Sequence, residues 1–115
     1  MNKIVLVAFN GELVCFAHVL LNALDMHSKG FEVKIVIEGT STKLVPELQR
    51  EGNPFRGLFK EALELDLVDG ACKACSAQMK VLDLIERAGL NLLGDMKGHP
   101  SIGRYIQEGY SIITF

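Results

Sequence analysis

The feature that most constrains the fold is an uninterrupted apolar run near the start of the chain, residues 3–9. A run this rich in branched residues indicates a central strand of a parallel sheet, because such a strand is covered on both faces. Asn10 and Gly11 break the run, and residues 12–29 then place a polar side chain at every third or fourth position, which predicts a helix. That polar stripe consists of His18, Asn22, Asp25 and Lys29.

After Gly30, residues 31–38 predict a second strand, and the same alternation continues to the end of the chain. Pro46 disfavours a helical Val45, so the helix that ends near Arg50 should be short or start late. Asn53 suits the cap of the next helix. The remaining strands are expected at 67–71, 90–93 and 110–115, and the remaining helices at 76–88 and 100–108. The buried face of the helix at 76–88 should consist of Ala77, Val81, Leu84, Ile85 and Ala88.

This alternation predicts a single α/β domain over residues 1–115, a three-layer α/β/α sandwich around a mostly parallel five-stranded sheet. The apolar fraction of 49% is ample for a core on both faces of the sheet. The order of the strands does not follow from the sequence.

Charge and composition exclude several classes of protein. The 12 basic and 14 acidic residues give a net charge of -2 without a basic stripe, so nucleic acid is not an expected partner. No apolar run is long enough to cross a membrane, and we expect a cytoplasmic protein. Neither a P-loop nor a GxGxxG spacing is present, and no cofactor is expected.

The residues best suited to chemistry are Cys72 and Cys75, which follow the third strand and begin a helix. Ligands of open parallel sheets bind at this edge, beyond the carboxyl ends of the strands. The amide groups of a helix start and the cation of Lys73 favour a thiolate, whereas Asp69 opposes it. Small neighbours keep the turn open to a substrate: Gly70, Ala71, Ala74, Ser76 and Ala77.

Three other interpretations of the cysteine pair compete with this one. Both thiols could be small buried hydrophobic groups three positions apart. A thioredoxin-like dithiol is disfavoured because thioredoxins carry the motif after an early strand, whereas here it follows the third strand. A closed zinc site needs four ligands, and the other candidates, dispersed along the chain, are Cys15, His18, His27 and His99, so no metal is expected.

The segment 94–100 is a second candidate loop, with His99 as a proton donor or Asp95 as an anchor. Asp, Gly and Pro at these positions are also what a turn into a helix requires. The turn is the better interpretation from the sequence alone.

Taken together, these motifs resemble the DsrE/DsrF family of small sulfurtransferases and sulfur-relay subunits over essentially the whole chain. The resemblance rests on the Asn10–Gly11 turn, on Cys72-Lys-Ala-Cys75, and on the segment 94–100 followed by Gly109-Tyr110. It implies an α/β/α fold, a homotrimer or hexamer, and sulfur carried on Cys72 as a persulfide, with Cys75 as a second thiol. Residues 78–81 lack the Arg-rich, Gly-terminated segment that often follows the cysteine in relay subunits.

Three functional hypotheses follow. The first is a sulfurtransferase or sulfur carrier in which Cys72 and Cys75 react, Asn10, Gly11 and Lys73 bind the substrate, and donor and acceptor proteins are the partners. The second is a non-catalytic oligomeric module that binds a small ligand or a protein. The third is a redox protein that cycles between the dithiol and the disulfide of the cysteine pair.

The apolar surface of the first helix bears on assembly. A helix that lies on a sheet needs one buried stripe, but here nearly everything outside the polar stripe is apolar. We therefore expect a homo-oligomer, with contacts through Val14, Phe16, Val19 or Leu20.

Overall fold

The sheet follows the alternation that the sequence predicts. The computed structural model describes residues 2–115, and its five strands all run parallel in the order β4-β3-β2-β1-β5. The α/β class and the three-layer arrangement are therefore confirmed. The strands are β1 (Lys3–Ala8), β2 (Glu32–Ile37), β3 (Val68–Cys72), β4 (Leu92–Leu93) and β5 (Ser111–Thr114).

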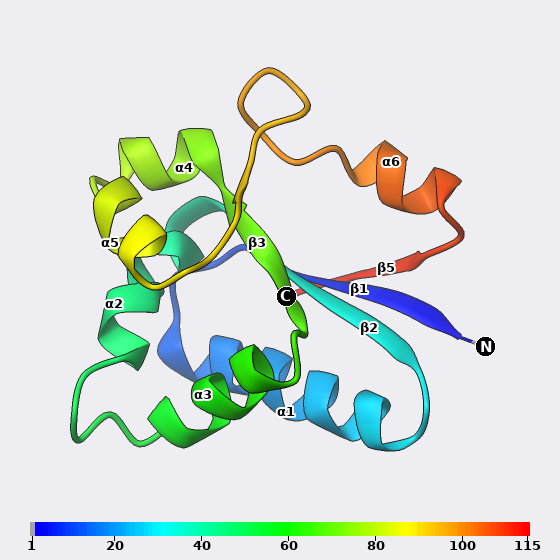
Figure 1. Cartoon of the computed structure of the whole chain (residues 1–115), viewed down its shortest axis with the longest axis horizontal. Helices are drawn as coiled ribbons and strands as arrows, with labels where there is room; N and C mark the ends of the chain where they lie inside the picture. The colour runs from blue at the N-terminus through cyan, green and yellow to red at the C-terminus, as the bar shows by residue number, and fades with distance from the viewer. Residues whose placement is uncertain (1) are drawn as a thin grey trace.

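The helices are divided unequally between the two faces of the sheet (Figure 1). One face carries α1 (Leu13–Ser28), α2 (Leu44–Leu48), α3 (Arg56–Glu64) and α5 (Leu82–Arg87), whose apolar side chains form the main core. The other face carries α6 (Ile102–Gln107). The 3-10 helix η1 (Gly39–Lys43) follows β2, and α4 (Lys73–Gln78) follows β3, both at the carboxyl edge of the sheet.

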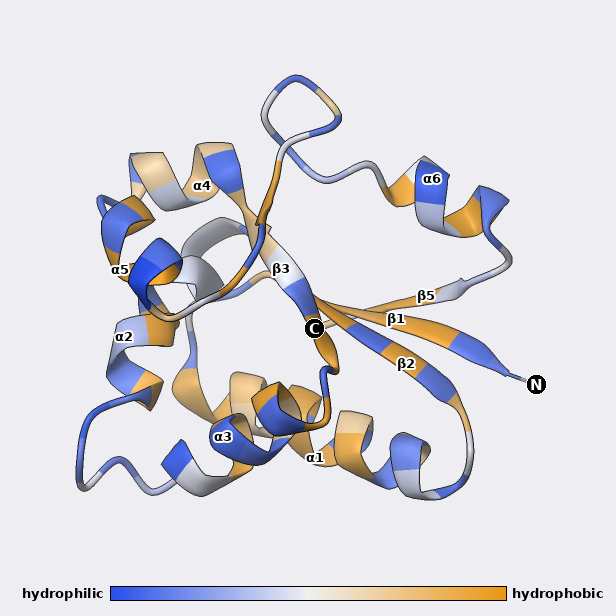
Figure 2. Ribbon diagram, viewed as in Figure 1, coloured by the Kyte–Doolittle hydropathy of each residue, from blue (hydrophilic) through white to orange (hydrophobic). Residues whose placement is uncertain are grey.

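The central strand β1 supplies both cores because its side chains alternate between the two faces. Leu6 and Ala8 lie in the core under α1, whereas Val5 and Val7 pack with Tyr105 under α6. In Figure 2, β1 is apolar along most of its length. Burial of each such Leu or Val side chain stabilises the fold by about 1.5–3 kcal/mol.

The single helix predicted over residues 76–88 is wrong, because the chain forms two helices, α4 and α5, separated by a turn. Lys80 has a positive φ of 61°, and the N–H of Val81 donates to the carbonyl of Ser76 at 2.9 Å, which closes α4. The turn changes the helical phase. Val81 and Ile85 remain buried, but Ala77 and Leu84 are exposed and Ala88 is half-buried.

Two details of predicted helix starts also differ from the structure. The helix α2 is short, with five residues, as Pro46 predicts, but Val45 is helical. Pro46 is tolerated because it lies in the first turn, where its missing N–H would have no partner within the helix. Asn53 does not cap α3. Its side-chain oxygen accepts from the N–H of Phe55 at 2.9 Å, and Phe55 occupies the cap position of a helix that begins at Arg56.

The exposed apolar residues of α1 are fewer than the sequence predicts. Phe16, Val19 and Leu20 are at most 1% exposed and belong to the chain's own core, so they are not available for contacts between subunits. Val14 remains exposed, together with Leu21. Assembly into an oligomer stays a prediction. Within residues 2–115, no helix combines the length and the apolar character needed to cross a bilayer.

Candidate functional site

Cys72 lies where the sequence places it, at the carboxyl end of β3 and the start of α4. It is the last residue of the strand and the cap residue of the helix, and its Sγ accepts a hydrogen bond from the N–H of Cys75 at 3.3 Å. The hydroxyl of Ser76 donates to the carbonyl oxygen of Cys72 at 2.7 Å, which holds the strand end against the first turn of α4. The spacing of the motif thus turns both thiols to the same side of the helix start.

His99 completes the cluster from a distant part of the chain. Its Nδ1 lies 3.1 Å from the Sγ of Cys72 and 3.8 Å from the Sγ of Cys75. One donor atom from each of the three residues lies within 4.8 Å of the other two. We call these three residues the thiol–imidazole cluster. From the sequence, His99 is a loop candidate and one of four dispersed residues considered for a zinc site, but no pattern places it beside the cysteines.

A tight turn delivers His99 to the thiols. The N–H of Met96 donates to the carbonyl of His99 at 2.8 Å, and the N–H of His99 donates back to Met96 at 3.0 Å. Between them Lys97 and Gly98 both have positive φ, 51° and 92°, as in a type I′ turn. The carbonyl of Gly98 accepts from the N–H of Ala74 at 2.8 Å, so the turn is attached directly to the start of α4.

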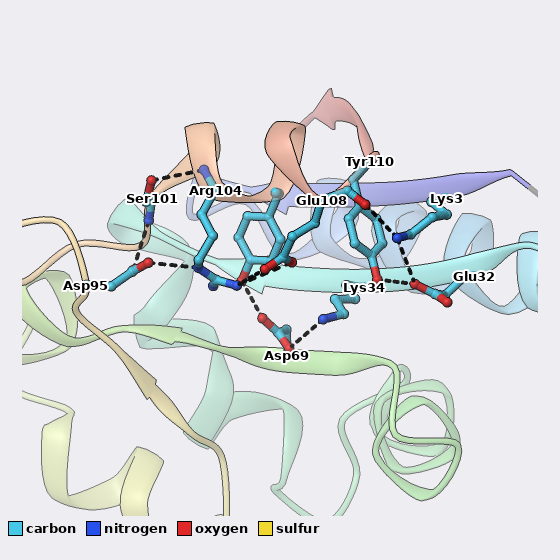
Figure 3. Close-up of polar contacts among 10 residues, drawn as sticks. Lys3, Glu32, Lys34, Asp69, Asp95, Ser101, Arg104, Glu108 and Tyr110 are labelled. Carbon is cyan, nitrogen blue, oxygen red and sulfur yellow. Dashed lines mark hydrogen bonds and ion pairs between the residues drawn. The ribbon is translucent and has the colours of Figure 1, made fainter.

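Asp95 fixes the other end of this loop (Figure 3). Its carboxylate accepts from the backbone N–H of Ser101 at 3.0 Å and from Nε of Arg104 at 2.8 Å. The hydrogen bond from Arg104 is the main reason that the pKa of Asp95 lies below its ordinary value. Asp95 is therefore an anchor of the turn into α6, in agreement with the interpretation that the sequence favours.

Polar contacts tie α6, and with it the His99 loop, to the sheet. The hydroxyl of Tyr105 donates to the carboxylate of Asp69 on β3, and Lys34 on β2 lies 3.6 Å from the same carboxylate. Figure 3 labels Asp69 and Lys34 among these side chains, together with the contact of Tyr110 with Glu32. The loop is thus held from α4 on one side and from α6 on the other.

The two thiols differ in exposure. Cys72 is fully buried, whereas Cys75 is partly exposed. Burial raises the pKa of Cys72 to about 12, although the N–H of Cys75 opposes the shift. Burial therefore opposes the Cys72 thiolate that the helix start is expected to favour. Because α4 has six residues, its amide groups do not offset the loss of water around a buried sulfur.

Glu38 adds a negative charge beside the cluster. It follows β2, the strand next to β3, and burial raises its pKa while the charge of His99 lowers it. Its charge also acts on Cys72. Glu38 is not among the residues predicted from the sequence, although a carboxylate directly after an apolar strand, at the edge where ligands bind, is a signal that points to it.

The three residues predicted to bind substrate lie at the same edge of the sheet but contact different groups. Lys73 is exposed and runs along the His99 loop, where a Cβ added at Gly94 would lie 3.5 Å from its Cδ. The side chain of Asn10 accepts from the N–H of Glu12 at 2.9 Å. Gly11 packs closely on Thr40 and Lys43 of η1. The contact of Asn10 therefore serves the turn into α1, and Gly11 allows that turn to pack on η1. A binding role for either residue stays a prediction.

Comparison with known proteins identifies one relative that covers most of the chain. It is the uncharacterized protein MJ0733 of Methanocaldococcus jannaschii, 35% identical over 96 residues, which are 84% of this chain and 76% of that protein. The chain belongs to the MJ0733 family. No family model matches it.

A second relative is similar to a shorter part of the chain. An uncharacterized protein of Archaeoglobus fulgidus is 50% identical over 30 residues, which are 26% of this chain and 81% of that protein. Both relatives are described as uncharacterized, so membership of the MJ0733 family brings no activity with it.

Proposed function

We propose that the chain is a sulfurtransferase or sulfur carrier that accepts sulfane sulfur as a cysteine persulfide on the Cys72–Cys75 pair. The observation that carries the proposal is the contact of both thiols with one imidazole nitrogen, at 3.1 and 3.8 Å. A thiol must lose its proton to attack a sulfur atom, and an imidazole within hydrogen-bond distance can take that proton. The resemblance to DsrE/DsrF proteins also supports persulfide chemistry at Cys72.

The difference in exposure assigns a separate role to each thiol. Cys75 is partly exposed and can meet a donor, whereas Cys72 has no exposed surface. Sulfur therefore enters at Cys75 and moves inward to Cys72. A persulfide held on a buried cysteine is shielded from thiols in solution, which would otherwise reduce it.

The entry step is a balanced exchange. The Cys75 thiolate attacks the outer sulfur of a donor persulfide, a sulfur–sulfur bond forms on Cys75, and the donor bond breaks to release the donor thiolate. In the second step Cys72 gives its proton to His99 and attacks the outer sulfur on Cys75. Cys75 leaves as a thiolate and recovers the proton from His99, so neither step needs an oxidant or a reductant.

The experiment is intact mass spectrometry of the reduced protein after incubation with a low-molecular-weight persulfide. We expect a gain of one sulfur atom in the native protein and in the control Cys15→Ser, whose thiol lies on α1 and is not part of the cluster. In Cys75→Ser the gain should be lost or strongly slowed. If the native protein gains no sulfur, the proposal is wrong.

The same atoms favour a dithiol redox function as a second candidate, because the two sulfurs lie within 4.8 Å of each other. Mild oxidation would then remove two hydrogen atoms without sulfur uptake. Such a result, with no gain of sulfur from the persulfide, supports the redox function over the first proposal.

A further inference from the structure

The donor atoms of the thiol–imidazole cluster have the spacing of metal ligands. A zinc ion that binds two sulfurs and one nitrogen tetrahedrally holds these atoms roughly 3.5–3.8 Å apart. Here the two sulfur–nitrogen distances are 3.1 and 3.8 Å, and one donor atom from each residue lies within 4.8 Å of the others. A shift of a few tenths of an ångström in the sulfur–nitrogen distances, and of at most about 1 Å between the two sulfurs, would bring the three atoms onto one coordination sphere.

The chemistry of these donors selects one class of ion. Two cysteine sulfurs and an imidazole nitrogen are soft or intermediate ligands, which favour Zn²⁺ and similar transition metals over Mg²⁺ or Ca²⁺. The carboxylate of Glu38 lies close enough for its charge to act on both Cys72 and His99. In its ionised form this carboxylate attracts a cation to the cluster.

The surrounding hydrogen bonds hold the ligands in place before any ion binds. The N–H of Cys75 points at the Sγ of Cys72 at 3.3 Å, a bond that stabilises a sulfur carrying negative charge. The His99 turn is attached to α4 through Gly98 and Ala74, and to α6 through Asp95. Support of this kind, from outside the ligand set, lowers the cost of ordering a site.

From this geometry we propose that Cys72, Cys75 and His99 bind one thiophilic divalent cation, such as Zn²⁺, with a fourth coordination position left open. A closed structural site would need a fourth protein ligand, but an open site needs three. The proposal does not rest on the sulfur-carrier function. It adds to that function a regulator, because an ion bound to both sulfurs blocks the attack of either one on a persulfide.

The binding test is a titration of the reduced full chain with Co²⁺, which substitutes for Zn²⁺ and reports its ligands by absorption. We expect one equivalent to bind, with sulfur-to-cobalt charge-transfer bands in the near ultraviolet and the visible bands of a tetrahedral ion, and Zn²⁺ should displace it. Native protein that shows no charge-transfer bands overturns the proposal, whether or not any variant folds.

Matched variants locate the ion. Cys75→Ser and His99→Gln should weaken Co²⁺ binding by more than about a hundredfold. That is a larger loss than is expected from removing a residue that only hydrogen-bonds to a ligand. The controls Cys15→Ser and His27→Gln remove the same residue types from α1 and should leave the titration unchanged. Equal effects of the control and cluster variants would overturn the assignment.

Measuring sulfur uptake in the presence of metal tests the regulatory role separately. One equivalent of Zn²⁺ should suppress the gain of sulfur from a persulfide, and a chelator should restore it. If the protein binds Co²⁺ through the cluster but takes up no sulfur in the absence of metal, the proposed metal site stands and the proposed sulfur-carrier function is wrong. Sulfur uptake that is unaffected by bound Zn²⁺ overturns the regulatory role alone.

Discussion

The Sγ atom of Cys72 lies 3.1 Å from the Nδ1 atom of His99, although 27 residues separate them in the chain. The contact joins the end of the third strand to the loop that enters the last helix. Because the type I′ turn and the Asp95 anchor fix that loop, the imidazole reaches the thiols without a large ordering cost. The predictions below follow from this arrangement and from the elements that support it.

The first prediction concerns the order in which the thiols react. In the folded protein we expect iodoacetamide to label Cys75 at least about tenfold faster than Cys72, because Cys72 is fully buried and its pKa is raised by that burial. Peptide mass spectrometry after short labelling times gives both rates. In denaturant the two rates should become similar, and faster labelling of Cys72 in the folded protein would contradict the assigned roles.

The second prediction concerns the Asp95 anchor and pH. The folded pKa of Asp95 is depressed below the ordinary 3.8, mainly by Arg104, so its ionised form stabilises the folded state. This contribution is present above about pH 4 and is lost as the pH falls through the folded pKa. Asp95→Asn should therefore lower Tm slightly near neutral pH and have a smaller effect near pH 3.

Arg104→Gln is the partner variant for this test. The Tm of Arg104→Gln should lose the same dependence on pH as that of Asp95→Asn. The double variant should be destabilised by less than the sum of the destabilisations of the two single variants. Thermal unfolding followed by circular dichroism gives the comparison. An effect of Asp95→Asn that is the same at pH 3 and pH 7 would show that the anchor acts through something other than its charge.

The third prediction concerns the close approach of β3 and β4. A Cβ added at Gly70 would lie 2.6 Å from the carbonyl oxygen of Asn91, which is too close for the two strands to keep their pairing. Gly70→Ala should lower the free energy of unfolding by about 1–3 kcal/mol. The control Gly57→Ala, in α3, meets nothing within 4 Å and should raise it by about 0.5–1 kcal/mol. Equal changes in urea unfolding would count against the strand contact.

The fourth prediction concerns the turn between α4 and α5. Lys80 has a φ of 61°, a conformation that costs a residue with a Cβ about 1–2 kcal/mol. Lys80→Gly should therefore stabilise the protein by about 0.5–1 kcal/mol after the added freedom of the unfolded chain is subtracted. Lys60→Gly, inside α3, should destabilise it by about 1 kcal/mol. If both variants destabilise in urea unfolding, the turn is not strained.

Most of the fold could be predicted from the sequence because its elements are strongly patterned. The apolar run of β1, the long period of α1 and the glycines at 30 and 89 each mark an element or its end. The strand order could not be predicted, since parallel strands of similar composition carry no mark of their neighbours. The break at Lys80 was missed because a lysine with positive φ has no signature in the sequence.

The candidate site could be predicted in part. The position of Cys72 and Cys75 follows from local pattern, since it depends on one strand, one turn and one helix start. The participation of His99 depends on where a distant loop crosses the sheet edge, which requires the strand order and the turn geometry together. The raised pKa of Cys72 was missed for a related reason, because the helix start is visible in the sequence and the burial is not.

The most direct test of the central account is to find which cysteine holds the sulfur after the native protein is treated with a persulfide donor. The trapped protein is alkylated and digested, and mass spectrometry of the peptides locates the added sulfur. We expect it on Cys72 in the native protein and on Cys75 in Cys72→Ser, with His99→Gln retaining it on Cys75. Sulfur found on Cys15 alone, or on neither member of the pair, would contradict the account.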